Sequence, residues 1–234
     1  MVSEENKADV VVRLPEGSGA ARLAAFVDSL VNQIARHWLA LFNALIGIFL
    51  ALPILAPVLM HLGLTGTGHL IYVAYSIVCH QLPERSYFLF GPQIVYTTHQ
   101  LEALKAVPAG LDIYARMMLR WPGSPQLGYK IAFCERDTAI WGSILLGGLA
   151  FARLRAGSRA LPKLPLWGYA LLLVPMAIDG FTQLFGWRES NWQLRTITGT
   201  LFGLATIWLA YPYVQEAMED VVRSGTATPG AVAS

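Results

Sequence analysis

The chain has 234 residues, of which 55% are hydrophobic and 14% are charged, and its mean hydropathy is +0.47. The apolar share is higher and the charged share lower than in ordinary soluble domains, so we expect an all-α integral membrane protein. The formal net charge of +2, without a basic block, excludes nucleic acid as an expected partner.

The first part of the chain is predicted to lie outside the hydrocarbon layer. Residues 1–19 are polar and rich in Pro and Gly, which is typical of a disordered tail. Apolar side chains recur at three- and four-residue steps through residues 20–36, which predicts an amphipathic interfacial helix. The membrane domain then covers residues 37–223, and residues 38–60 form a first span of the length that a bilayer requires.

The middle of the chain combines a short apolar segment with a polar insertion. The segment 70–81 is only about half a span long and is followed by Pro83, so we expect a half-helix or re-entrant segment on the outer side. Residues 91–128 are polar and rich in Pro and Gly, which indicates an insertion outside the membrane. Short helices are expected in this insertion near residues 100–107 and 111–121.

Three further spans are predicted at residues 129–152, 166–185 and 196–213, and residues 224–234 are predicted to form a disordered tail. Short loops rich in Lys and Arg stay in the cytoplasm, and such a loop connects two of these spans through Arg153, Arg155, Arg159 and Lys163. We therefore expect a multi-pass protein of the cell (inner) membrane with both termini cytoplasmic. Four spans are favoured over five, and the insertion 91–128 then lies on the outer side.

Polar residues gather near the outer ends of the predicted spans. With a helical rise of 1.5 Å per residue, Asp137, Asp179 and Arg195 lie at similar heights, roughly 20–27 Å above the cytoplasmic ends. Thr198 is expected in the same layer. Asp179 should contact Arg136 or Arg195, since a carboxylate at that depth needs a cation. The candidate ligand-binding residues are Arg136, Asp137, Asp179, Gln183, Asn191 and Arg195. Alternatively, these charges only neutralise one another where helix packing has buried them.

The two cysteines, Cys79 and Cys134, are expected to lie close together on the outer side. An oxidising outer compartment favours a disulfide between them. Zinc accepts thiolate, imidazole and carboxylate ligands, so a zinc site formed by Cys79, His80, Cys134 and Asp137 is the second interpretation. The two interpretations exclude each other, and the spacing of these residues alone is weak support for a metal site.

Five polar segments stand out along the last two-thirds of the chain: CHQLPERS at 79–86, CERDTAI at 134–140, DGFTQLFG at 179–186, RESN at 188–191 and RTITG at 195–199. Together they resemble the motifs of a prokaryotic family of predicted membrane proteins of unknown function. The resemblance implies a multi-span membrane fold and points to the same residues, but it implies no activity. Some members of that family carry a second cysteine where this chain has Asp137, a departure that weakens the case for a thiolate-rich metal site.

Two functions from different classes fit this sequence. The first is a site at the outer leaflet that binds a metal ion or a small anionic or lipid-like ligand, with arginine forks suited to phosphate or carboxylate. The alternative is a non-catalytic accessory subunit or assembly factor of a larger membrane complex, in which a Cys79–Cys134 disulfide and the ion pairs are structural. The expected partners are the lipid bilayer and, in the second case, other membrane subunits. No nucleophile–base set indicates a reaction, so the sequence leaves open whether the protein is an enzyme.

Overall fold

The structure is a computed structural model that describes residues 19–157 and 161–226, most of which are helical. The chain divides into two compact units. The larger unit is Leu39–Val214, and the smaller is Met1–Trp38 with Gln215–Ser234. The predicted tails at 1–19 and 224–234 lie outside the described residues, except that Gly19 begins the first helix and residues 224–226 end the last one.

The smaller unit consists of the first part of α1 (Gly19–His61) and the last part of α7 (Trp192–Thr226). The indole N–H of Trp38 donates a hydrogen bond of 2.9 Å to the side-chain oxygen of Gln215. The predicted interfacial helix 20–36 is continuous with the predicted span 38–60, because α1 runs through both. Its exposed apolar side chains are Leu23, Phe26, Val27, Leu30, Val31 and Ile34.

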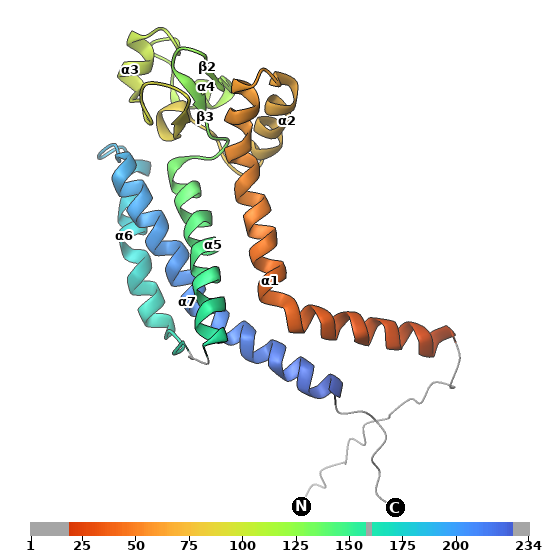
Figure 1. Ribbon diagram of the computed structural model, residues 1–234. Coiled ribbons are helices and arrows are strands. Elements are labelled where there is room, and N and C mark those ends of the chain that lie inside the picture. The colour runs from red at the N-terminus through yellow and green to blue at the C-terminus, as the bar shows by residue number, and fades with distance from the viewer. Residues whose placement is uncertain (1–18, 158–160, 227–234) are drawn as a thin grey trace, which may run out of the picture. The chain divides into compact units, whose positions relative to one another are not determined.

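Four helices run through the larger unit: α1, α5 (Glu135–Ala156), α6 (Leu166–Leu184) and α7 (Figure 1). Helices α5 and α7 approach closely at glycines, since a Cβ placed on Gly147 would lie 3.3 Å from Leu204 and from Ile207. The Tyr169 and Thr206 hydroxyls, 3.2 Å apart, join α6 to α7. Small residues at such crossings let helix backbones pack without bulky side chains between them.

Among the described residues, three helices are long and apolar enough to cross a membrane: Arg22–His61, Glu135–Ala156 and Trp192–Gly225. Helix α6 is not one of these three, although it has 19 residues. Its Asp179 and Gln183 lower the hydropathy of an otherwise apolar sequence. The expected fourth span at 166–185 therefore stays a prediction.

Short elements form a cap at one end of these helices (Figure 1). Helix α2 has 11 residues and ends at Tyr75, so it overlaps only the first half of the predicted segment 70–81, whose half-helix or re-entrant nature stays a prediction. A three-stranded antiparallel sheet with the order β1-β3-β2, which the sequence did not predict, pairs Phe88 with Lys130 and Gly123 with Tyr129. The elements of the cap are α2 (Thr65–Tyr75), η1 (Pro83–Arg85), β1 (Phe88–Leu89), α3 (Thr98–Ala103), α4 (Ile113–Met118), β2 (Gly123–Ser124) and β3 (Gly128–Lys130).

The predicted span 129–152 begins too early, because α5 starts at Glu135. The preceding residues are not helical: the backbone N–H of Ile131 donates to the carbonyl of Tyr87, and that of Ala132 donates to the carbonyl of Pro53. Their apolar side chains pack in a protein core rather than against lipid, together with Ala56, Met60, Tyr72, Tyr75 and Cys79. This core brings the end of α2 against the start of α5 and so defines the position of the two cysteines.

Candidate functional site

The two cysteines lie side by side, as expected, but they are free thiols 3.9 Å apart. The backbone N–H of Cys134 donates to the sulfur of Cys79 at 3.2 Å. The backbone N–H of Asp137 donates to the sulfur of Cys134 at 3.3 Å, so Cys134 is the N-cap of α5. A disulfide requires sulfurs about 2.05 Å apart. The structure therefore does not contain the disulfide that one interpretation of the sequence required.

Three of the four predicted metal ligands come together. The sulfurs of Cys79 and Cys134 and a carboxylate oxygen of Asp137 all lie within 4.8 Å of one another. His80 lies outside this cluster, and its role as a ligand stays a prediction. The reason for its position is local: Cys79 is buried in the core, while the next residue along the irregular backbone is exposed.

Asp179 is the centre of an ion network at the end of α6. The aspartate is only 1% exposed and forms an ion pair with Arg136 of α5, which confirms the predicted contact. A second guanidinium, that of Arg188, lies 2.7 Å from the other carboxylate oxygen of Asp179. The side-chain amide of Gln183 donates at 3.3 Å to the oxygen that pairs with Arg136. Arg188 follows α6 in an irregular loop. Its pairing with Asp179 was not predicted, because an arginine in such a loop resembles a solvated surface charge.

Arg195 of α7 has a different acidic partner, Glu135, at 3.0 Å. Both side chains are buried, and the guanidinium also donates to the carbonyl of Ser190 at 2.7 Å. Glu135 was not among the predicted site residues, although it stands in the charged segment that begins at Cys134. Thr198 was expected in the same polar layer. The Thr198 hydroxyl donates to the Leu194 carbonyl of its own helix and lines neither cavity described below.

Asn191 serves as a helix cap. Its side-chain oxygen accepts a hydrogen bond of 2.9 Å from the backbone N–H of Leu194, in the first turn of α7. This satisfies one of the donors that every helix leaves free at its N-terminus. The residue lines a cavity, so the structure gives it a structural role while leaving its predicted ligand role untested.

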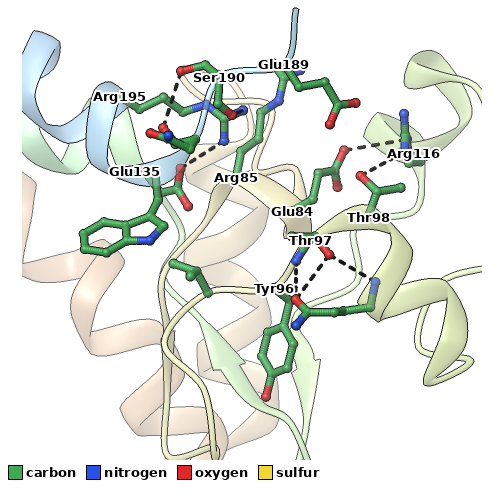
Figure 2. A pocket seen from close by; sticks show the side chains of 14 residues that line it. Glu84, Arg85, Tyr96, Thr97, Thr98, Arg116, Glu135, Glu189, Ser190 and Arg195 are labelled. Atoms are coloured by element: carbon green, nitrogen blue, oxygen red, sulfur yellow. Dashed lines mark hydrogen bonds and ion pairs between the residues drawn. The ribbon is translucent and has the colours of Figure 1, made fainter.

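Two cavities adjoin these charges. The first, which we call the cysteine cavity, measures about 250 Å³ and is lined by Cys79, His80, Arg85, Cys134, Arg136, Asp137, Gln183 and Arg195, with Val78, Gln81 and Leu82. The second, which we call the loop cavity, measures about 150 Å³ and adjoins residues 95–98 and 189–192. In Figure 2, Arg195, Ser190 and Glu135 gather on one side of the loop cavity and Glu84, Thr98 and Arg116 on the other. Arg85 and Arg195 line both cavities and so form a common wall.

Arg85 differs from Arg195, the other arginine of the common wall, because Arg195 has a carboxylate partner. It is half-buried, and within residues 19–157 and 161–226 it makes no hydrogen bond or ion pair. Burial, followed by the guanidinium of Arg195, lowers the pKa of Arg85. The Nε atoms of Arg136 and Arg195 are also buried without a hydrogen-bond partner. On the common wall, Arg195 is paired with Glu135, whereas Arg85 forms no ion pair with a described carboxylate, although the nearby charge of Glu84 raises its pKa.

Lys130 supports the loop that carries Cys79. Its side chain is fully buried, and its amino group donates to the backbone carbonyl of Gln81 at 2.6 Å. Gln81 has a positive φ of 54°, which a residue with a side chain rarely adopts, so this bond holds a strained turn. Burial lowers the pKa of Lys130 to about 7. Lys130 was not among the predicted site residues, because it stands at the beginning of the predicted span 129–152, apart from the polar segments.

The long apolar helices define the chain as an integral membrane protein of the helical class. Residues 126–209 match a family described as "Predicted membrane protein (DUF2085)". The chain is also similar to "Uncharacterized protein MJ1492" of Methanocaldococcus jannaschii, with 29% identity over 164 residues that cover 68% of this chain and 80% of the relative. No solved structure shows significant similarity. The matched family segment includes Cys134, Asp179 and Arg195. It begins at residue 126, after Cys79 and Arg85, and so does not include them.

Proposed function

We propose that this chain is a multi-pass membrane protein that binds an anionic group, a phosphate or a carboxylate, in the cysteine cavity. The observation that carries this proposal is Arg85, a half-buried guanidinium on the cavity wall without a partner among the described residues. Arginine presents a planar fork that matches phosphate and carboxylate oxygens, and burial strengthens such charge-assisted bonds. An anion at Arg85 would supply the missing partner.

The neighbouring arginines favour an anion rather than a cation next to Arg85. Arg136 and Arg195 line the same cavity, and each already has one carboxylate partner, Asp179 and Glu135 respectively. Their Nε atoms remain without acceptors. Three guanidiniums therefore surround a space for a ligand of a few non-hydrogen atoms.

The proposed membrane topology has four spans, with α6 crossing the bilayer beside the three longer helices. The 19 residues of α6 extend about 28 Å at 1.5 Å per residue, close to the thickness of the hydrocarbon core. Exposed aromatic side chains, Trp167 at one end and Phe185 and Trp187 at the other, suit the two interfaces. Asp179 is buried away from lipid. With the basic loop after α5 in the cytoplasm, the cavity lies at the outer leaflet.

Binding of inorganic phosphate to the purified full chain in mild detergent tests the proposal. Isothermal titration should give a dissociation constant that Arg85→Gln weakens roughly 10- to 100-fold, the effect of about 1.5–3 kcal/mol for a charged hydrogen bond. Arg120→Gln, which changes an exposed arginine, is the matched control and should bind as the unmodified chain does.

A parallel titration distinguishes a soluble ligand from a lipid headgroup. Nanodiscs with and without phosphatidic acid supply the same phosphate chemistry at the membrane surface. If phosphatidic acid in the nanodisc abolishes the binding of inorganic phosphate, the lipid headgroup is the tighter ligand. If phosphate binding is unchanged, the ligand is soluble. Equal binding by the unmodified chain and Arg85→Gln in both formats would overturn the proposal and favour the accessory-subunit function.

A further inference from the structure

We propose that Cys79, Cys134 and Asp137 bind one zinc ion, with a fourth coordination position open to the cysteine cavity. The three side chains come from two segments, the turn after α2 and the first turn of α5, which the apolar core holds together. This inference concerns the same cavity as the proposed function, but it rests on different residues and does not require Arg85.

The spacing of the sulfurs fits a metal site better than a disulfide. Zinc binds thiolate sulfur at about 2.3 Å, so two sulfurs on a tetrahedral ion lie about 3.8 Å apart. The thiols of Cys79 and Cys134 are 3.9 Å apart. The carboxylate oxygen of Asp137 lies within 4.8 Å of both, a distance that a change in the side-chain torsions would shorten to the edge of a tetrahedron. The backbone therefore needs little movement to complete the site.

Backbone hydrogen bonds position both sulfurs, but the neighbouring Cys79 thiol, burial and the Asp137 charge raise the pKa of Cys134, so zinc would have to displace the proton of that thiol. Each sulfur accepts one backbone N–H, from Cys134 and from Asp137 respectively, at 3.2 and 3.3 Å. Cys134 also caps α5, where the free N–H groups and the helix dipole stabilise negative charge. A hydrogen bond from a backbone amide to a ligating sulfur fixes that ligand in position.

The charge of the cavity is compatible with a loaded site. Two thiolates and one carboxylate carry a charge of about −3, and a divalent ion leaves about −1. Arg85 has no carboxylate partner among the residues that the structure describes, so the remaining negative charge would face a guanidinium. Two neutral thiols with one carboxylate also carry about −1, so loading with zinc leaves the net charge that Arg85 faces unchanged.

The ligand set selects the type of ion and leaves one position open. Thiolates favour zinc over magnesium and calcium, which prefer oxygen ligands. Three protein ligands with a free fourth position are typical of zinc sites that bind water or a substrate. His80 lines the cavity but lies outside the ligand cluster, so it leaves that position open. An anion held by Arg85 would reach the ion there, and zinc would polarise its oxygen.

The test is metal content and cobalt substitution of the full chain, purified in mild detergent with reductant and without chelator. We expect about one zinc per chain by elemental analysis. Replacement with cobalt should produce the visible bands of a tetrahedral site and a near-ultraviolet thiolate-to-cobalt band. Cys79→Ser and Cys134→Ser should each weaken the thiolate band by about half or lose the ion, and Asp137→Asn should weaken cobalt affinity at least tenfold.

His80→Asn is the matched control, since it changes a cavity residue outside the cluster, and it should keep the full spectrum. If the cysteine variants fail to fold, the thiolate-to-cobalt band of the unmodified chain and the cobalt affinity of Asp137→Asn still test the proposal. Absence of bound metal and of a thiolate band in reduced protein would overturn the proposal, as would equal loss of cobalt by His80→Asn. Arg85→Gln should lose phosphate binding but keep cobalt, so failure of the cation site and failure of the anion site are separable.

Discussion

Arg195 and Glu135 form a buried ion pair of 3.0 Å that joins α7 to the first residue of α5. The next residue along α5, Arg136, pairs instead with Asp179 of α6. Successive residues of a helix point about 100° apart, so neighbouring charges at one helix end reach two different helices. The N-terminus of α5 therefore contributes the acidic partner of one ion pair, to α7, and the basic partner of the other, to α6. Each pair joins a different helix to α5.

Replacing Asp179 with Asn should destabilise the protein by about 3 kcal/mol. The change leaves Arg136 and Arg188 next to a neutral amide, and breaking a buried ion pair by removing one partner costs roughly 3–5 kcal/mol. The thermal unfolding midpoint in detergent measures the effect. Asp220→Asn is the control, because that exposed aspartate pairs, within the described part of the chain, with an exposed arginine one turn away. Asp112 in the cap is not a suitable control, because its side chain caps α4 and its replacement would itself destabilise that helix.

A silent Asp179→Asn variant, equal to Asp220→Asn in accumulation and unfolding midpoint, would contradict this interpretation of the network. In that case the two arginines would have other hydrogen-bond acceptors, and their ion pairs with Asp179 would not contribute to stability.

Adding one methyl group at Gly203 should weaken the contact of α7 with α5. A Cβ at this position would lie 2.1 Å from the Ser143 hydroxyl oxygen and 2.6 Å from the Ile140 carbonyl oxygen. Because the second atom belongs to the backbone, the helices must separate, and we expect Gly203→Ala to cost about 1–3 kcal/mol. Unfolding in detergent measures the loss.

Gly142 of α5 is the matched control for Gly203. A Cβ there would meet nothing within 4 Å, so Gly142→Ala should be neutral or stabilise the helix by up to about 1 kcal/mol. The opposite order of the two variants would show that α5 and α7 do not pack at this glycine.

Stability should depend on pH through Lys130. Burial lowers the pKa of this lysine from 10.5 to about 7, and Tyr72, Cys79 and Glu84 are the titratable groups near it. Between these two pH values the unfolded chain holds a proton that the folded chain has released. The free energy of unfolding therefore rises with pH from about 7 to 10.5, and the charged amine destabilises the fold fully below pH 7.

Unfolding midpoints of the unmodified chain and of Lys130→Met, measured at several pH values, isolate this contribution. The stability of Lys130→Met relative to the unmodified chain should fall as the pH rises from 7 to 9.5. Lys105→Met, at an exposed lysine, should show a difference that is independent of pH. A constant difference for both variants would place the lysine pKa near its ordinary value.

The proposed topology predicts that the cap is outside the cell and that the loop after α5 is inside. Cysteines introduced at two exposed alanines, Ala109→Cys in the cap and Ala156→Cys at the end of α5, provide a matched pair. An impermeant thiol reagent applied to intact cells should label the first and spare the second, with the unmodified chain as background. Labelling of the second alone would invert the topology.

The heights of polar residues along helices could be predicted from the sequence. A fixed rise per residue placed Asp179 level with Arg136, and the two form an ion pair in the structure. The proximity of Cys79 and Cys134 followed from two polar segments that interrupt apolar sequence. Arg195 could not be assigned to Glu135, because the direction in which a side chain leaves a helix has meaning only once the neighbouring helices are positioned.

The cap shows where sequence patterns become too short to interpret. Its strands have two or three residues, fewer than an alternating pattern requires, and glycines at Gly91, Gly123 and Gly128 allow their backbones to meet. Residues 131–133 are apolar and were assigned to a span, yet they are buried in a core with residues of α1 and α2. Apolar composition does not distinguish a protein core from lipid over so few residues.

Asp179 also has a consequence for how the protein is made. During cotranslational insertion, a carboxylate in a lone helix costs about 2.5–3.5 kcal/mol to move from the translocon into lipid. Arg136 belongs to the helix synthesised before α6, whereas Arg188 emerges nine residues after the aspartate. In the proposed four-span topology, we therefore expect α5 to remain at the translocon until α6 arrives, so that the two helices enter the bilayer as a hairpin whose charge is already neutralised.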